Sequence, residues 1–259
     1  MPKTMILQVD IGNSRIKWRL LDKQNSMVAG SQPTSTILSG EPLALQGVTS
    51  VSEVRVASVA NPVVTASLQR QLAERFAVSI KMAQVSAKVG AVCCGYKNPH
   101  QLGVDRWLAV LAAYQQFPER LLVVDAGSAI TLDLVSSEGQ HQGGYIFPGL
   151  RLMNEALRGG TEAVDVISNN ASNILTPGKD SQQAVNKGCL MAAVAAVEKL
   201  VSQQPIRVVV TGGDAEVLLN GLNSTTDSLD KELIKPKYIL THCPDLVLDG
   251  LSIPSISLV

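Results

Sequence analysis

The first half of the chain alternates between short apolar runs and segments rich in turn-forming residues. Runs of apolar residues, or apolar residues at every second position, predict strands, whereas apolar residues three or four positions apart predict helices. These patterns predict strands at 5–10, 15–22, 27–32, 54–59 and 78–83 and helices at 63–76 and 103–117. A polar stretch without a predicted element covers residues 33–50.

The second half of the chain repeats this order of elements. We expect strands at 121–125, 129–135, 140–147, 206–211 and 238–241, and helices at 149–158, 181–203, after residue 215 and at 245–251. In each half three strands come first and helices then alternate with strands, which indicates a duplicated α/β fold. The boundary is expected at residues 117–120, so the predicted domains are 1–118 and 119–259.

One short pattern occurs twice, about half a chain apart, each time between two predicted strands. It reads Asp-Ile-Gly-Asn-Ser at residues 10–14 and Asp-Ala-Gly-Ser-Ala at residues 125–129. Glycine allows a sharp turn and a close approach to a ligand, and small side chains leave the N–H groups of the turn accessible to phosphate oxygens. The Asp adds a carboxylate that can hold a hydrated cation. One copy would fit an ordinary hairpin, but two copies predict a nucleotide held between the halves of a duplicated domain.

Other segments combine glycine or tyrosine with residues that can do chemistry. In a Gly-Val-Asp-Arg segment before a helix, Asp105 fits either a helix cap or a proton acceptor, and Arg106 fits a clamp for an anionic group. Residues 143–149 fit either a turn before a helix or a strand edge that approaches a ligand. Residues 211–215 end a strand and open a helix, a position that faces ligands in α/β folds. Tyr96 fits either an exposed turn residue or the wall of a small-substrate pocket.

Composition and charge narrow the range of partners. The formal net charge is zero and basic residues do not cluster, so we expect no nucleic-acid partner. No apolar run approaches the ~20 residues of a membrane span, and the N-terminal residues lack the pattern of a signal peptide. We therefore expect a cytoplasmic protein that does not bind membranes. The four cysteines form no C-x-x-C pair and the three histidines lack metal-ligand spacing, which favours reduced thiols and disfavours a zinc site.

Taken in order, these segments resemble type III pantothenate kinases, a family of the acetate and sugar kinase/heat-shock chaperone/actin superfamily. The resemblance covers residues 5–251 and rests on residues 10–18, 103–106, 125–133, 143–149 and 211–215. Within the superfamily the G-x-D-R step distinguishes this kinase, and the Ile-Lys-Trp ending of the first segment is similar to the proteobacterial branch. The resemblance implies an α/β fold of duplicated ribonuclease H-like (actin-like ATPase) domains, with a nucleotide cleft between them.

The resemblance also implies roles for individual residues. Asp105 matches the acceptor of the hydroxyl proton, Asp125 matches a ligand of a monovalent cation (K⁺ or NH₄⁺), and Asp10 would help to hold the Mg²⁺ that accompanies ATP. The ATP-binding residues are expected to be Asp10, Ile11, Gly12, Asn13, Ser14, Arg15, Ile16, Lys17 and Ser128. The substrate-binding residues are expected to be Tyr96, Gly103, Val104, Asp105, Arg106 and Ser181. Ser128 and Ser181 stand where the family usually has Thr, and each keeps the hydroxyl.

The implied function is ATP-dependent phosphorylation of the primary hydroxyl of pantothenate, the first step of coenzyme A biosynthesis. The family is dimeric, and we expect a homodimer built largely by the apolar helix that follows Ser181. Two alternatives stay open: another small-molecule kinase or a phosphatase of the same superfamily, and a non-catalytic regulatory protein that only binds nucleotide. Asp10, Asp105 and Asp125 are all present, which favours an enzyme over the second alternative.

Overall fold

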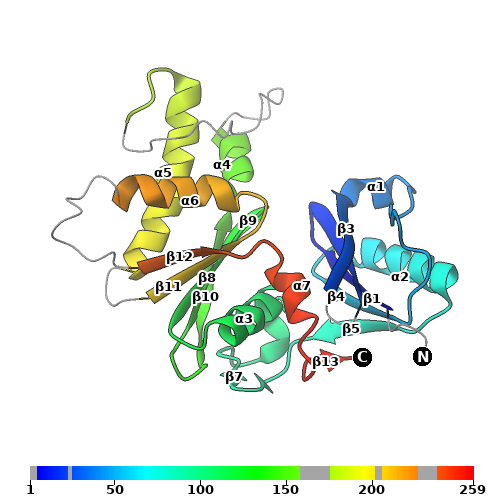
Figure 1. The fold of residues 1–259 in the computed structure, drawn as a ribbon. Helices are drawn as coiled ribbons and strands as arrows, with labels where there is room; N and C mark the ends of the chain where they lie inside the picture. Colours follow the sequence, from blue (N-terminus) through cyan, green and yellow to red (C-terminus); the bar gives the residue numbers. More distant parts are fainter. Residues whose placement is uncertain (1–4, 23–24, 158–175, 202–205, 227–237) are drawn as a thin grey trace. The chain divides into compact units, whose positions relative to one another are not determined.

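Figure 1 shows the computed structural model, which describes residues 5–22, 25–157, 176–201, 206–226 and 238–259. The chain forms two compact units. Residues 1–115 together with 246–259 make the first unit, and residues 116–245 make the second. Across the described ranges, no helix is long and apolar enough to cross a membrane.

The first unit is built on a six-stranded sheet in the order β13-β5-β4-β1-β2-β3. Its strands are β1 (Met5–Ile11), β2 (Arg15–Asp22), β3 (Asn25–Pro33), β4 (Glu53–Ser58), β5 (Ile80–Gln84) and β13 (Ser257–Leu258). Strands β1, β2 and β3 form an antiparallel meander, β4 pairs parallel to β1, and β5 pairs parallel to β4. The five strands predicted for the first half of the chain are all present.

The alternation of side chains gives this sheet one apolar face. Leu7, Val9 and Ile11 of β1 are fully buried. They belong to one cluster with side chains from α1 (Thr34–Leu38) and α2 (Pro62–Phe76). Burying an aliphatic side chain of this size contributes about 1.5–3 kcal/mol, so this cluster stabilises the first unit.

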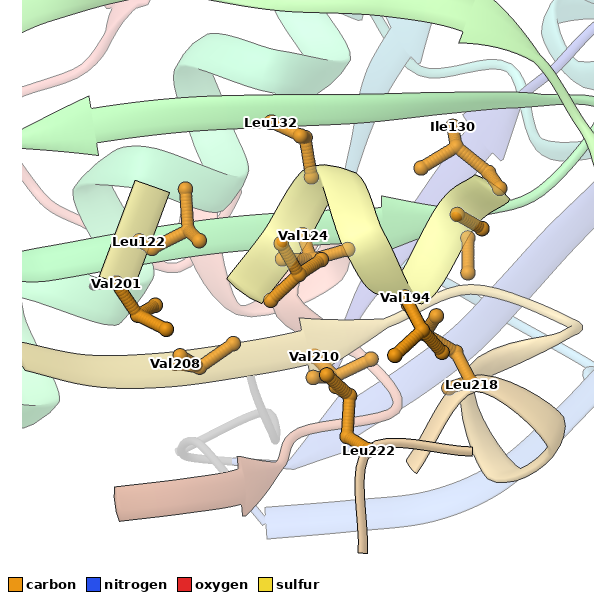
Figure 2. Packing of buried hydrophobic residues seen from close by; sticks show 14 of the residues in the cluster. Leu122, Val124, Ile130, Leu132, Val194, Val201, Val208, Val210, Leu218 and Leu222 are labelled. Carbon is orange, nitrogen blue, oxygen red and sulfur yellow. The ribbon is translucent and has the colours of Figure 1, made fainter. Parts of the chain in front are cut away.

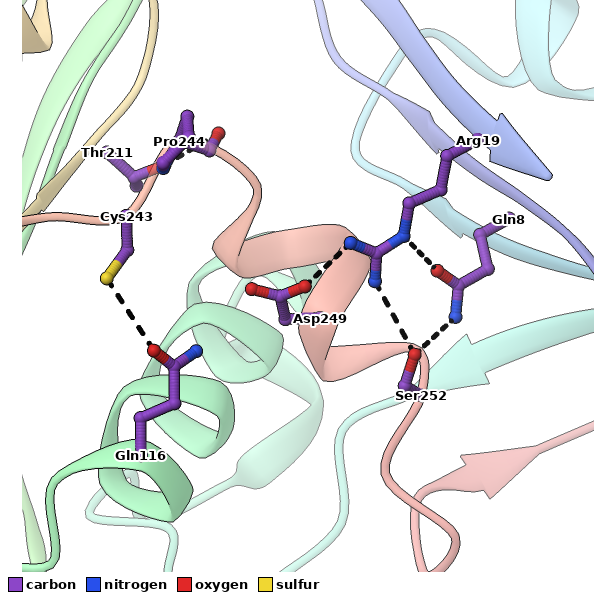
Figure 3. A network of polar contacts seen from close by, with 8 residues as sticks. All are labelled: Gln8, Arg19, Gln116, Thr211, Cys243, Pro244, Asp249 and Ser252. Atoms are coloured by element: carbon purple, nitrogen blue, oxygen red, sulfur yellow. Dashed lines mark hydrogen bonds and ion pairs between the residues drawn. The ribbon is translucent and has the colours of Figure 1, made fainter. Parts of the chain in front are cut away.

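The opposite face of the same sheet holds the C-terminal residues through a buried polar network (Figure 3). Arg19 donates to Oε1 of Gln8 and to Oδ1 of Asp249, each over 2.7 Å, and Gln8 donates to the hydroxyl of Ser252 over 2.9 Å. Asp249 lies in α7 (Leu246–Gly250). We expected these C-terminal residues in the second domain, but this network and the pairing of β13 with β5 hold them in the first unit.

The predicted helix at 103–117 is α3 (Val104–Gln116). Its residues from Arg106 to Tyr114 are all buried, so the helix lacks a solvent face along most of its length. Three short elements come before it: β6 (Lys88–Val89), β7 (Val92–Cys93) and the 3₁₀ turn η1 (Pro99–Gln101). They lead the chain from β5 to the Gly-Val-Asp-Arg segment.

The second unit repeats the topology of the first. Its sheet has the order β10-β9-β8-β11-β12. The strands are β8 (Leu121–Ala126), β9 (Ala129–Val135), β10 (His141–Pro148), β11 (Ile206–Thr211) and β12 (Tyr238–His242). Again the first three strands form an antiparallel meander and the next two pair in parallel. Because β3-β2-β1-β4-β5 has the same connectivity, the predicted duplication is confirmed.

Helices α4 (Leu150–Leu157), α5 (Ser181–Val201) and α6 (Ala215–Thr226) belong to the second unit. Figure 2 shows how side chains of α5 and α6 pack with those of β8, β9 and β11 in its core. The buried residues of α5 are Cys189, Leu190, Ala193, Val194, Val197 and Val201. They lie on one side of the helix, whereas Met191 on another side is 48% exposed.

The elements that the sequence did not predict are short. They are α1, β6, β7, η1 and β13. Two to five residues are too few to display a period of two or of 3.6, so hydrophobic patterning cannot reveal them. The predicted ends of two helices, residue 158 and residues 202–203, lie outside the described residues.

Candidate active site

The first glycine turn links β1 to β2 and is held by hydrogen bonds to α1. The N–H of Gly12 donates to the carbonyl oxygen of Arg15 over 3.0 Å and closes the turn. The hydroxyl of Thr34 donates to the carbonyl of Gly12 over 2.8 Å, and the N–H of Thr34 donates to the carbonyl of Ser14 over 2.9 Å. A β-carbon at residue 12 would lie 2.9 Å from the Arg15 oxygen, which explains the glycine. The sequence did not indicate this role of Thr34, because no motif around residue 34 marks it as a residue that supports the turn.

Asp10 lies next to the end of β1, beside this turn. Its β-sheet partners are Lys17 on β2 and Ala57 on β4, and it is half-buried. Directly opposed residues of an antiparallel pair have β-carbons about 4.5–5.5 Å apart, so a lysine is the neighbour of this carboxylate. A carboxylate oxygen is a ligand that Mg²⁺ accepts, and Lys17 adds positive charge where phosphate oxygens would gather. The residues present therefore fit a Mg²⁺–phosphate group at this turn. The side chain of Arg15, also predicted to bind ATP, donates instead to the hydroxyl of Ser31 on β3 over 2.7 Å.

The Gly-Val-Asp-Arg segment opens α3. The N–H of Trp107 donates to the carbonyl of Gly103 over 3.0 Å, so the helical hydrogen bonds begin at residue 103 and Val104 is the first helical residue. Asp105 lies in the first turn, and its Oδ1 accepts from the N–H of Arg106 over 2.8 Å. Negative charge is favoured at a helix N-terminus. Asp105 is half-buried, and this position suits an ionised carboxylate.

Arg106 and Tyr96 form a pair beside this carboxylate. The Nη1 of Arg106 donates to the Tyr96 hydroxyl over 2.9 Å, and the guanidinium carbon lies 5.7 Å from the centre of the Tyr96 ring. Arg106 is 6% exposed. A guanidinium held in this way is pre-oriented, so it loses little freedom when it binds an anion. The structure thus brings together Tyr96, Gly103, Asp105 and Arg106, which the sequence had grouped as substrate-binding residues.

The second glycine turn links β8 to β9. The N–H of Gly127 donates to the carbonyl of Ala129 over 3.0 Å, two residues ahead, so this turn is one residue shorter than the first. The N–H of Gly149 donates to the carbonyl of Ser128 over 3.0 Å. A β-carbon at residue 149 would overlap the carbonyl oxygen of Gly127 and lie 2.7 Å from that of Ser128. Gly149, which ends the 143–149 segment, therefore packs against this turn. This packing explains why residue 149 is a glycine, and no ligand is needed to explain it.

The 211–215 segment approaches the same turn from β11. Thr211 is the pairing partner of Asp125, because β8 and β11 run parallel. Gly212 has φ +98°, and a β-carbon there would overlap the Ala126 carbonyl and lie 2.5 Å from Oδ1 of Asp125. The N–H of Asp214 donates to the same Ala126 carbonyl over 2.8 Å. Three segments that are far apart in sequence therefore meet at one edge of the second sheet.

Two carboxylates accompany this second turn. Asp125 is half-buried beside Gly212, and its oxygens are the type of ligand that an alkali-metal ion binds, so the residues present fit such a cation. Burial raises the pKa of the Asp214 carboxyl above its ordinary value, and the charge of Arg151 offsets this effect only in part. Ser128 is half-buried within the turn.

A buried polar pair, which the sequence did not reveal as a pair, connects β9 to β10. His141 and Asp133 are 0% and 2% exposed, and Nε2 of the histidine lies 2.9 Å from Oδ1 of the aspartate. The pair flanks a register shift between His141 and Gly144. It thereby holds the start of β10 against β9. Gly149, which contacts the second turn, directly follows this strand.

Ser181 was the remaining predicted substrate-binding residue. It is the first residue of α5 and is exposed. The hydrogen bonds around it join its neighbours, because Asp180 accepts from the backbone N–H and the side-chain amide of Gln183. Its role in substrate binding stays a prediction.

Comparisons with known proteins agree on one family. A family model described as type III pantothenate kinase matches residues 6–203. A type III pantothenate kinase of Chromohalobacter salexigens is 40% identical over 84% of this chain and 80% of its own length. One from Pseudomonas aeruginosa is 35% identical over 96% of this chain and 98% of its own length.

Solved structures support the fold alone. A Campylobacter jejuni protein provisionally described as a Baf family transcriptional activator has a TM-score of 0.56 at 20% identity, over 95% of this chain and 94% of its own. The ethanolamine utilization protein EutJ of Carboxydothermus hydrogenoformans has a TM-score of 0.52 at 13% identity, over 98% and 90%. These likenesses fit the duplicated α/β fold, and the sequence matches supply the family: this chain belongs to the type III pantothenate kinases.

Proposed function

We propose that this chain transfers the γ-phosphoryl group of ATP to the primary hydroxyl of pantothenate, the first step of coenzyme A biosynthesis. The observation that carries the proposal is the Gly-Val-Asp-Arg segment in a member of this family. Its carboxylate stands in the first turn of α3, beside an arginine held by Tyr96. A base and an anion-binding group at adjacent positions suit a substrate that has both a hydroxyl and a carboxylate.

Asp105 is the proposed general base. The substrate oxygen forms a bond to the γ-phosphorus, the bond from that phosphorus to the bridging oxygen of ATP breaks, and ADP leaves. Asp105 accepts the proton of the hydroxyl during this step. Phosphoryl transfer depends mainly on positioning and charge stabilisation, so no covalent intermediate with the protein is needed. Arg106, oriented by Tyr96, binds the carboxylate of pantothenate and thereby orients the hydroxyl.

The glycine turns are the proposed binding sites for the phosphates of ATP. The N–H groups around Asn13 and Ser14 and the hydroxyl of Ser128 donate to phosphate oxygens. Mg²⁺, when bound to ATP, neutralises charge on the transferred group. Asp10 holds that ion, and Lys17 adds a second positive charge.

Asp125 is the proposed ligand of K⁺ or NH₄⁺, which would offset its charge close to the nucleotide. Replacement of Asp125 by Ala is expected to lower activity in K⁺ buffer and to abolish the difference between K⁺ and Na⁺. Initial rates in K⁺, NH₄⁺ and Na⁺ buffers measure this. Equal rates of the unmodified chain in all three buffers would contradict a cation site at Asp125.

We also propose a cytoplasmic homodimer with α5 at the subunit contact and Ser181 close to the substrate. The residues of α5 outside its buried side include Ala184, Met191, Ala192 and Ala195, and small side chains allow close approach of a second helix. Sedimentation at micromolar concentration is expected to give the mass of a dimer. A monomer with full activity would contradict the proposed dimer.

The test of the main proposal is ATP consumption with pantothenate as acceptor. The unmodified chain is expected to release ADP only when pantothenate is present, and Asp105→Asn is expected to lower the rate about 10²–10⁴-fold, because Asn cannot accept the proton. Glu74→Gln, which removes an exposed carboxylate on α2, is the control and should keep the full rate.

The same assay separates the alternatives. Activity on another hydroxyl compound but not on pantothenate would indicate a different kinase of the superfamily. Nucleotide binding without turnover on any acceptor would indicate the regulatory alternative. Near-normal turnover of Asp105→Asn would remove this residue from the mechanism.

A further inference from the structure

Gly103 has no conformational reason to be a glycine. The described glycines with a left-handed φ are Gly40, Gly47, Gly90, Gly143, Gly139 and Gly212, and Gly103 is not among them. An alanine therefore fits the backbone at this position. The reason for glycine must lie in what surrounds its missing side chain.

The surroundings of Gly103 contain one close atom, and it belongs to Asp105. A β-carbon at residue 103 would lie 2.5 Å from Oδ1 of Asp105. The next two atoms are also side-chain atoms, Cγ of Asp105 at 3.7 Å and Cδ of Arg106 at 3.9 Å. A distance of 2.5 Å is too short for a carbon and an oxygen that are not bonded, so the carboxylate would have to rotate away.

We infer that Gly103 is a positioning residue for Asp105: the absence of a side chain at residue 103 leaves the space that the Asp105 carboxylate occupies. Its Oδ1 stays in that space by accepting from the N–H of Arg106 over 2.8 Å. The carbonyl of Gly103 accepts from Trp107, so residue 103 is fixed by the start of α3 and cannot move aside. This inference rests on the proposed role of Asp105 as general base.

The inference differs from the expectation that Gly103 contacts the substrate. If Gly103 mattered through substrate contact, a methyl group there would weaken binding and raise the KM for pantothenate. If it acts through Asp105, the methyl group displaces the base while binding persists, so kcat falls and KM changes little. A displacement of about 1 Å in a reacting group can cost 10²-fold in rate.

The experiment is Gly103→Ala in the full chain, assayed for kcat and KM with both substrates and for thermal unfolding. We expect kcat to fall about 10–100-fold. Both KM values should stay within about threefold, and the unfolding temperature should not decrease, because alanine suits this backbone. Glu74→Gln, at an exposed position on α2, is the control and should keep the normal rate.

A double-mutant cycle with Asp105→Asn tests whether Gly103 acts through Asp105. Residues that act as a unit show non-additive effects. Adding Gly103→Ala to Asp105→Asn should therefore change the residual rate less than about twofold. The inference is overturned by an unchanged kcat in Gly103→Ala, by a raised KM for pantothenate at constant kcat, or by an equal loss of rate in both backgrounds.

The outcomes also separate this inference from the proposed function. An unmodified chain that does not phosphorylate pantothenate contradicts the proposed function. A fully active Gly103→Ala beside an active unmodified chain and an inactive Asp105→Asn contradicts only the role of Gly103. A further outcome is that Gly103→Ala lowers both the unfolding temperature and the rate, to the same extent with and without Asp105→Asn. Such a result would show a purely structural role of residue 103 and would overturn the inference.

Discussion

The two glycine turns have the same strand–turn–strand framework, but the protein holds them in different ways. The turn after β1 is held by one residue that follows soon in the chain: the hydroxyl and the N–H of Thr34 bond to Gly12 and Ser14. The turn after β8 is held by two distant segments, in which Gly149 and Gly212 pack directly on its backbone. The first support is therefore a pair of hydrogen bonds from one residue. The second combines hydrogen bonds from the N–H groups of Gly149 and Asp214 with close packing of backbone on backbone.

This difference determines how each turn tolerates mutation. A hydrogen bond contributes about 0.5–1.5 kcal/mol, and its loss leaves the neighbouring atoms in place. A side chain forced between two backbones costs more, because neither backbone can move without breaking the sheet that carries it. The second turn should consequently be the more rigid one, and its glycines should be the least replaceable.

The largest effect is expected for Gly149→Ala. Its new methyl group would overlap the carbonyl of Gly127, so we expect destabilisation of the second unit by about 3 kcal/mol and loss of most activity. Urea unfolding followed by circular dichroism measures the first effect, and ADP release measures the second.

Gly213→Ala is the matched control for stability. Residue 213 lies beside Gly212 in the same segment, but no atom lies within 4 Å of its would-be β-carbon. Its unfolding curve should coincide with that of the unmodified chain. Equal stability of Gly149→Ala and Gly213→Ala would contradict the proposed support by close packing.

A smaller effect is expected for Thr34→Val, which tests the first turn. Valine keeps the shape but cannot donate to the carbonyl of Gly12, so stability should fall by about 1 kcal/mol. The KM for ATP should rise several-fold, since the turn loses one of two supports, while kcat stays close to normal.

Thr36→Val provides the comparison for Thr34→Val. The Thr36 hydroxyl is on the same helix and donates to the carbonyl of Pro33 over 2.8 Å, not to a carbonyl of residues 12–14. Its KM for ATP should not change. An equal rise in both variants would indicate that α1, and not the bond to Gly12, supports the turn.

The smallest effect is expected for Asp214→Asn beside the second turn. Burial raises the pKa of the Asp214 carboxyl, so the folded chain binds the proton more tightly than the unfolded chain does. The resulting stability is present below the ordinary pKa of Asp and is lost as the pH rises through the raised value. Asp214→Asn should therefore be slightly more stable than the unmodified chain near neutral pH, and this difference should disappear in acid.

Urea unfolding of both chains across this pH range provides the measurement. Asn is as good a helix cap as Asp, so the start of α6 should persist in the variant. A variant less stable than the unmodified chain near neutral pH would show that the ionised carboxylate is favoured by a partner, contrary to the desolvation that raises its pKa.

The sequence predicted most long elements and the duplication, because periods of two and of 3.6 are properties of neighbouring residues. Strand β2 begins and ends where predicted, and α2 begins one residue earlier than predicted. The sequence also grouped Tyr96 with residues 103–106, and in the structure Tyr96 contacts Arg106. It did not indicate that Thr34 supports the first turn or that His141 pairs with Asp133, since no local pattern marks either residue.

The sequence by itself determined which residues can do chemistry and at which ends of strands and helices they stand: Asp10, Asp105 and Asp125 follow from hydrophobic periodicity and turn residues alone. Only the tertiary structure decided that Gly149 and Gly212 support the second turn and that residues 246–259 complete the first unit. The physical reason is range. Patterns record which face of an element is apolar, whereas these contacts join atoms of segments whose approach depends on how the whole sheet is assembled.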